Sequence, residues 1–287
     1  MNRPLVSVLT PSFNQAAWLT DNLGSVAAQT YPAIEHVVMD GGSTDGTLDI
    51  LKTAGDRVLW RSESDRGQAD AINKAFAASS GEIIGWINSD DAYVDDRVIA
   101  DVVDFFERNP AVDVAYGHCL QTTANGRIIQ VLWAPGFDHD LLLTVDFITQ
   151  PGVFMRRSVL SEPLLDDTFH FAMDYELWLR LAGKGATFAR LPRFVAIDRH
   201  QPDRKSVNLL DVHSANSSRL AEKHGARLPG TRDRQRTLFY LQQRVLGAAL
   251  IPRIPRALAF ETPQDPRRGL LRRQLLTRKS RWPAEFR

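Results

Sequence analysis

The sequence has little cysteine and no long apolar run. Cys119 is the only cysteine among 287 residues, which excludes an internal disulfide or a cysteine-based zinc cluster and is typical of a reducing compartment. No run approaches the ~18 apolar residues that span a bilayer, and the apolar run 5–9 is shorter than the usual signal-peptide core of about 7–15 residues. We therefore expect a cytoplasmic protein that is not integral to a membrane.

Net charge is also nearly absent, but the total hides a split. The formal charge is +1; residues 1–218 hold 18 basic and 29 acidic residues (−11), and residues 219–287 hold 17 and 5 (+12). With 44% hydrophobic and 24% charged residues, the composition excludes a disordered or collagen-like chain. The basic tail interleaves arginine with leucine and proline and has few aromatics to stack on bases, so we expect no nucleic-acid partner.

Short apolar runs alternate with helical patterns over the first ninety residues. The runs predict strands at 5–10, 34–39, 58–60 and 83–87 with helices between them. Apolar strands joined by helices predict a parallel sheet covered on both faces, with its ligand at the carboxyl ends of the strands. Further along, we predict helices at 98–106 and 175–182, strands at 112–116, 127–133, 188–191 and 194–197, and helical structure from 209.

Three polar clusters follow predicted strands, at 10–14, 40–47 and 86–91. Glycines after Asp40 let the backbone approach a ligand, and an acidic side chain at this place can accept hydrogen bonds from a ribose or a base. Asp90 and Asp91 repel one another unless a cation lies between them, and Mg²⁺ or Mn²⁺ favours such oxygen ligands. Each cluster alone also fits an ordinary strand end, and Asp90-Asp91 alone fits a loop cap.

The clusters together resemble glycosyltransferase family 2, the inverting nucleotide-sugar enzymes of GT-A fold. The resemblance spans roughly residues 4–206 and rests on residues 10–14, 29–32, 40–47, 63–68 with 73–75, 89–91 and 173–178. It implies an α/β fold of GT-A type: a Rossmann-like, mostly parallel sheet flanked by helices, with a helical C-terminal extension. The implied domains are a glycosyltransferase domain, 1–206, with a nucleotide-binding half at 1–91 and an acceptor-binding half at 92–206, and a basic extension at 207–287.

The resemblance also assigns roles to individual residues. It implies nucleotide and donor binding by Thr10, Pro11, Phe13, Asn14, Asp40, Gly41, Asp65, Arg66, Gln68, Asn73, Ser89 and Asp90. It implies Asp174 as catalytic base, Asp91 as ligand of Mn²⁺ or Mg²⁺, His200 as a further candidate near the metal, and Gln150 and Trp178 on the acceptor side. Met173 stands where the family has a glutamate, which removes any role of that first acid. Arg66 also fits a structural partner of a neighbouring carboxylate.

The implied reaction is transfer of one sugar from a nucleoside-diphosphate sugar to a saccharide or lipid-linked acceptor, in surface polysaccharide or glycolipid assembly. UDP- and dTDP-linked donors are favoured over GDP-linked donors. Two alternatives stay open: a sugar nucleotidyltransferase, although residues 10–14 lack a basic residue for a triphosphate, and an inactive scaffold. Apolar residues beside arginines at 234–281 fit peripheral contact with an anionic membrane on its inner face, packing on the domain itself, or a homo-oligomer.

Overall fold

The computed structural model describes residues 3–169, 171–201, 210–227 and 233–250. The predicted boundary at 206 and the tail beyond 250 lie outside the described residues. The strands are β1 (Val6–Ser12), β2 (Ile34–Asp40), β3 (Leu59–Ser62), β4 (Ile83–Trp86), β5 (Ala92–Tyr93), β6 (Val114–Thr123), β7 (Ile128–Leu132), β8 (Val153–Arg156) and β9 (Phe188–His200). The helices are α1 (Ala16–Ala27), α2 (Thr47–Ala54), α3 (Gln68–Ala78), α4 (Val98–Arg108), α5 (His139–Leu142), α6 (Met173–Gly183), α8 (Leu210–His224) and α9 (Arg234–Leu250), with short 3₁₀ turns η1 (Gly55–Arg57), η2 (Gln150–Gly152) and η3 (Arg157–Val159).

One sheet runs through the described protein in the order β3-β2-β1-β4-β8-β6-β9-β5, with β7 paired to β6. The first four strands are parallel, as their apolar runs predict. Beyond β4 the sheet is mixed, because β8 inserts antiparallel between β4 and β6, while β6 and β9 are parallel. This is the α/β GT-A arrangement expected from the sequence, with the strictly parallel part confined to the first half.

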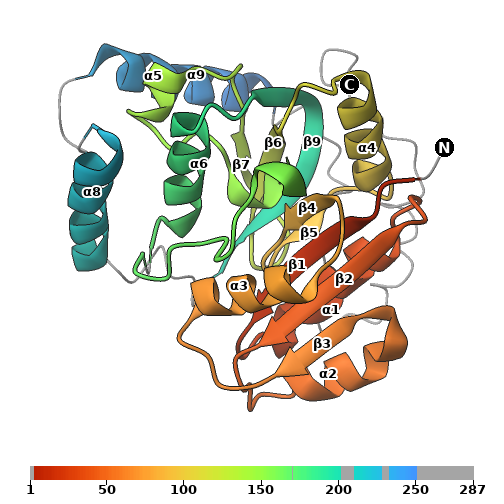
Figure 1. The fold of residues 1–287 in the computed structure, drawn as a ribbon. Helices are drawn as coiled ribbons and strands as arrows, with labels where there is room; N and C mark the ends of the chain where they lie inside the picture. Colours follow the sequence, from red (N-terminus) through yellow and green to blue (C-terminus); the bar gives the residue numbers. More distant parts are fainter. Residues whose placement is uncertain (1–2, 170, 202–209, 228–232, 251–287) are drawn as a thin grey trace.

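Both faces of the sheet are covered. Alternation along β2 sends Val37 into the core with Ile72 of α3 and sends Val38 into a cluster beneath α1 and α2. In Figure 1, α3 lies across β1 and β2, and α2 lies below β3. All seven residues of β1 are buried, as a central strand requires.

The predicted strands at 188–191 and 194–197 form one continuous strand, β9. Pro192, which has no backbone N–H to donate, lies between the two predicted strands. The register with β6 shifts at Gly117, so that the proline lies in a bulge and the strand continues past it. A Cβ at Gly117 would lie 2.4 Å from Val195 Cγ2, and only glycine fits the close approach of the two strands.

The described part of the C-terminal extension packs on the rest of the molecule. Leu220 of α8 and Phe239 of α9 are buried in the same core cluster as α6. Figure 1 shows α8 beside α6 and α9 near α5. Within the described residues, no helix has the length and apolar character needed to cross a bilayer.

Candidate active site

A cavity of about 690 Å³ opens at the carboxyl ends of β1 and β4, between the first turn of α3 and the first turn of α6. Ten of the predicted site residues line it: Pro11, Phe13, Gly41, Asp65, Gln68, Ser89, Asp90, Asp91, Gln150 and Asp174. These come from segments as far apart in the sequence as Pro11 and Asp174. Those that follow β1, β2 and β4 meet because parallel strands end at the same edge of a sheet.

Seven predicted residues are not among those that line this cavity. They are Thr10, Asn14, Asp40, Arg66, Asn73, Trp178 and His200. Thr10 is buried against His36, and Asn73 holds the backbone of Leu165 through two hydrogen bonds. The Trp178 side chain is fully buried in the core.

Asp40 performs a structural task at the end of β2. Its carboxylate accepts hydrogen bonds from the backbone N–H groups of Gly42 and Ser43 and from the hydroxyls of Ser43 and Ser62. The carboxylate therefore fixes the glycine-rich turn that leads from β2 to α2. Contact between Asp40 and a nucleotide base stays a prediction.

Gly41 allows the close approach that brings Asp65 to the cavity. A Cβ at Gly41 would lie 2.7 Å from Asp65 Oδ2. Asp65 also accepts a 2.8 Å hydrogen bond from the Gly67 N–H, directly before α3. Nearby, Arg66 turns away from the cavity and pairs with Asp70 and Asp167, which is the structural role left open for it by the sequence.

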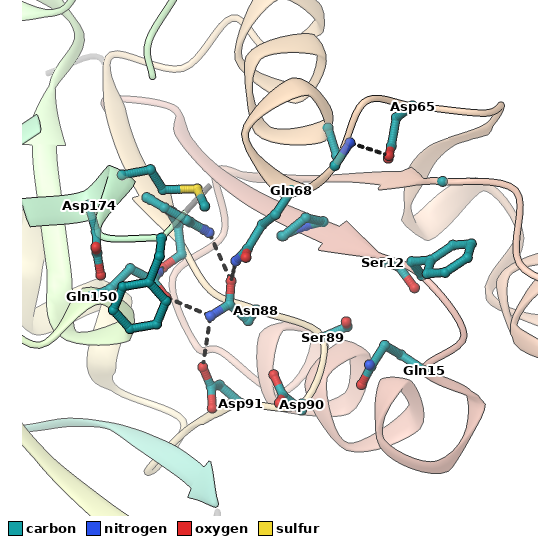
Figure 2. Close-up of a pocket in the computed structure, with 18 of the residues that line it drawn as sticks. Ser12, Gln15, Asp65, Gln68, Asn88, Ser89, Asp90, Asp91, Gln150 and Asp174 are labelled. Atoms are coloured by element: carbon teal, nitrogen blue, oxygen red, sulfur yellow. Dashed lines mark hydrogen bonds between the residues drawn. The ribbon is translucent and has the colours of Figure 1, made fainter. Parts of the chain in front are cut away.

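The Asn88 side chain lines the cavity and is hydrogen-bonded to several of its other side chains (Figure 2). Its side-chain amide donates to Gln150 Oε1 at 2.8 Å and to Asp91 Oδ2 at 3.4 Å, while its Oδ1 accepts from Gln68 at 2.8 Å and from Trp86 at 3.1 Å. Sequence reasoning assigned Asn88 no role, although it stands in the polar cluster 86–91. Its bonds orient the side chains that face the ligand space.

The adjacent acids Asp90 and Asp91 both line the cavity. Asp91 is 3% exposed, and its Oδ1 accepts a 2.9 Å bond from the Arg199 backbone N–H. Gln201, which also lines the cavity, donates to Asp90 at 3.4 Å. Gln201 and Asp198 were missed because they follow from the register of β9 against β6, which the sequence does not show.

Asp90 and Asp91 offer carboxylate oxygens, the ligands that a divalent cation such as Mg²⁺ favours. No cluster of three or more His, Cys, Asp or Glu side chains forms a metal centre in the described part of the chain. Mg²⁺ sites that take substrate phosphates use one or two protein carboxylates and complete the shell with phosphate and water. A carboxylate has about four acceptor positions, so Asp91 can bind a cation while it keeps the hydrogen bonds from Asn88 and from the Arg199 N–H. Asp90 and Asp91 fit such a site, and His200 does not complete a preformed one.

Asp174 lies in the first turn of α6 and faces the cavity (Figure 2). Its Oδ1 accepts a 2.9 Å bond from the Tyr175 N–H. Ala172, directly before the helix, adopts a left-handed conformation with φ 60°, a strained geometry for a residue with a Cβ that fixes how the helix begins. Glu176 points the other way and is buried against α8.

The cavity is strongly acidic. The described lining contains no lysine or arginine. It contains six aspartates: Asp65, Asp90, Asp91, Asp146, Asp174 and Asp198. Arg204 and Lys205 lie outside the described residues. Within the described lining, an anionic ligand would meet only negative charge unless a cation accompanied it.

The sheet order and the polar cavity at its carboxyl edge are those of a GT-A fold. The family described as "Glycosyl transferase family 2" matches residues 7–164, and the chain belongs to this family. Family membership favours glycosyl transfer over the nucleotidyl transfer that the sequence had left open.

Named relatives agree with the family. The chain is 32% identical over 165 residues to a PGL/p-HBAD biosynthesis glycosyltransferase of Mycobacterium bovis, which covers 56% of this chain and 62% of the relative. It is 30% identical over 190 residues to the putative teichuronic acid biosynthesis glycosyltransferase TuaG of Bacillus subtilis, covering 64% and 75%. The match thus spans less than two thirds of the mycobacterial protein.

Two solved structures share the fold. S. aureus TarS 1-349 in complex with UDP-GlcNAc has a TM-score of 0.61 at 18% identity over 76% of this chain and 66% of that one. The mannosyltransferase PcManGT from Pyrobaculum calidifontis, in complex with GDP-Man and Mn²⁺, has a TM-score of 0.56 at 18% identity over 90% and 72%. At these identities the likeness shows the fold alone.

Proposed function

We propose that this protein transfers one sugar from a nucleoside-diphosphate sugar to an acceptor hydroxyl, with inversion and with a divalent cation. The observation that carries the proposal is the acidic cavity, in which Asp90 and Asp91 line one part and Asp174 another. A diphosphate needs positive charge, and within the described lining a divalent cation on the paired acids is the source that fits.

The donor occupies the side of the cavity formed by β1, β4 and the start of α3. Phe13 is 58% exposed at the cavity, where an aromatic ring offers a face for a nucleotide base. The backbone at Gly41 and the side chains of Asp65 and Asp90 supply polar contacts for ribose and sugar. We favour a UDP- or dTDP-linked donor, in line with the UDP-GlcNAc bound in the TarS structure.

In the reaction, Asp174 accepts the proton of the acceptor hydroxyl as its oxygen attacks the anomeric carbon. The helix N-terminus stabilises the negative charge that Asp174 needs for this role. Asp91, with Asp90 beside it, would hold Mn²⁺ or Mg²⁺, which neutralises the charge of the departing nucleoside diphosphate when bound. A single displacement inverts the anomeric configuration.

Two experiments test this mechanism. Asp174→Asn should retain nucleotide binding but lower transfer by about 10²–10⁴-fold, the usual contribution of a general base. The matched control is Asp140→Asn, the same change at an exposed position on α5. Turnover of Asp174→Asn close to that of the control would remove Asp174 from the role. If EDTA treatment left the release of nucleoside diphosphate unchanged, a role of the divalent cation in the reaction would be excluded.

We further propose that the acceptor belongs to surface polysaccharide or glycolipid assembly, as the names of the mycobacterial and Bacillus relatives suggest. A lipid-linked acceptor would place the enzyme on the inner face of the membrane. The surface that fits is one side of α9, where Leu238, Leu241 and Val245 are 59%, 56% and 60% exposed at helical spacing. Arg234 and Arg244, also exposed on α9, would meet anionic headgroups.

Sedimentation with phosphatidylglycerol vesicles tests the membrane contact. The wild type should sediment with these vesicles and much less with phosphatidylcholine vesicles. Replacement of Leu238, Leu241 and Val245 by serine should abolish sedimentation while leaving turnover of a soluble donor unchanged. Equal sedimentation of the variant would exclude this face of α9.

A further inference from the structure

Arg199 lies near the end of β9 and has no part in the proposed reaction, yet its backbone N–H donates the 2.9 Å hydrogen bond to Asp91 Oδ1. The pairing of β5 with β9 ends at Ala92 and Ile197, and beyond it the Arg199 N–H meets the Asp91 carboxylate in place of strand backbone. The bond that Asn88 donates to Asp91 Oδ2 is longer, at 3.4 Å. Of these two bonds, the one from the Arg199 N–H therefore orients the carboxylate more firmly.

The Arg199 side chain is fastened to α1. It is 1% exposed, its Nη2 lies 3.1 Å from Asp21 Oδ2, and its guanidinium lies over the Trp18 ring at 4.7 Å from the centroid. Asp21 is itself buried. Alternation along β9 sends this side chain to α1, while the preceding Asp198 faces the cavity. The strand end that carries the N–H is therefore held by two residues of α1.

The same face of α1 holds the other partner of that hydrogen bond. Asn22, which is fully buried, donates to the carbonyls of Asn88 at 2.9 Å and Asp91 at 3.3 Å. Trp18, Asp21 and Asn22 are three and four residues apart, so they share one face of the helix. One side chain of α1 thus fixes the turn that carries Asp91, and two others fix the end of β9.

The ion pair between Arg199 and Asp21 is better suited to fix geometry than to stabilise the fold. The removal of two charges from water costs about as much as their attraction returns, so well-packed apolar side chains of similar size commonly stabilise a protein equally well. Apolar side chains lack direction, whereas a planar guanidinium between a carboxylate and an aromatic ring has a defined position. The pair therefore serves to place the backbone of β9.

We propose that Arg199 is a positioning residue for the divalent cation. Held by Asp21 and Trp18, it keeps its N–H against Asp91 Oδ1, so that the carboxylate is already oriented when Mn²⁺ or Mg²⁺ arrives with the nucleoside diphosphate. Loss of the groups that orient a metal-binding side chain typically weakens metal binding by about 10–100-fold. The inference rests on the proposed function, in which Asp91 binds the cation.

A charge-neutral replacement of the pair tests the inference. Asp21→Leu combined with Arg199→Met removes one charge of each sign, so the net charge near the cavity does not change. Binding of Mn²⁺ in the presence of UDP, followed by the electron paramagnetic resonance signal of free Mn²⁺, should weaken by about 10–100-fold. The urea midpoint should stay close to that of wild type, and so should the affinity for uridine, which carries no phosphate for a cation to bind.

A matched control removes another buried ion pair of the same strand. Arg193 Nη2 lies 2.6 Å from Asp95 Oδ2, and the two side chains are 11% and 10% exposed. Asp95→Leu combined with Arg193→Met should leave the Mn²⁺ affinity unchanged. Arg199→Lys keeps the charge beside Asp21 but loses the planar guanidinium, and it should weaken Mn²⁺ binding several-fold.

The outcomes separate the positioning role from the proposed function. Wild-type Mn²⁺ affinity in the Asp21→Leu, Arg199→Met protein, or an equal loss in the control protein, would overturn the positioning role and leave the cation in place. If the first protein did not fold, wild-type Mn²⁺ affinity in Arg199→Lys would overturn the role in the same way. A wild-type protein that bound no Mn²⁺ with UDP would instead refute the cation of the proposed function, and the positioning role with it.

Discussion

The contact between α6 and α8 is built around the buried carboxylate of Glu176, and removal of its charge should destabilise the fold. Glu176 is fully buried; its Oε1 accepts Lys223 Nζ at 2.8 Å and His224 Nε2 at 3.1 Å, and its Oε2 pairs with Arg180 Nε at 3.1 Å. Burial alone would raise the pKa of Glu176, but hydrogen bonds from His224 and Lys223 and the charge of Arg180 outweigh it and lower the pKa to about 2.

The lowering from 4.5 to about 2 corresponds to about 3 kcal/mol, because each pKa unit is worth about 1.36 kcal/mol. Glu176→Gln should therefore lower the free energy of unfolding by about 3 kcal/mol at pH 7. Urea denaturation followed by tryptophan fluorescence measures this, and Glu222→Gln, an exposed change on the same helix as Lys223, is the control.

The stabilisation by Glu176 should decrease as the pH falls. Because the pKa of Glu176 is lower in the folded protein, its stabilisation is complete above about 4.5 and is lost as the pH falls towards 2. The difference between wild type and Glu176→Gln should shrink over this window. A difference below about 1 kcal/mol at pH 7, or one that persists at the acidic end, would refute the role of the buried carboxylate.

Two glycines should respond differently to alanine. A Cβ at Gly81 would lie 2.3 Å from Ser7 Oγ and 2.6 Å from Ser7 N, so Gly81→Ala should destabilise the fold by about 1–3 kcal/mol, measured by urea denaturation. Gly41→Ala should instead displace Asp65 and weaken nucleotide binding several-fold, measured by calorimetry with UDP and Mn²⁺. Unchanged nucleotide affinity in Gly41→Ala would show that Asp65 does not contact the donor.

The first half of the fold was predictable because its signal is local. Buried parallel strands are continuous apolar runs, and each of the four predicted in the first ninety residues is present. The insertion of β8 between β4 and β6 was not predictable, because antiparallel pairing over long sequence separations leaves no periodic signature. The packing of α8 and α9 depends on single contacts, such as the two bonds between Gln243 and the Trp133 backbone.

The part of the site that lies at the ends of the parallel strands was predictable from the sequence, and the rest was not. Residues after β1 and β4 were found because chain direction alone places them at one edge. Asp146, Asp198 and Gln201 were missed, since they reach the cavity from an irregular segment and from a strand in the mixed half of the sheet. Asp40 shows the opposite limit: a carboxylate after a strand can equally bind the N–H groups of its own turn, and residue type does not distinguish the two.

The split in charge has a structural meaning at this site. Lys223 of the basic extension bonds Glu176, two residues after Asp174, and Arg236 bonds the carbonyl of Thr144, two residues before Asp146. The extension therefore holds the two segments that carry Asp174 and Asp146, and its positive charge offsets acids of residues 1–206. Truncation of the extension would disturb the site along with any membrane contact. Substitutions on the exposed side of α9 leave these bonds intact, and only they can separate membrane binding from catalysis.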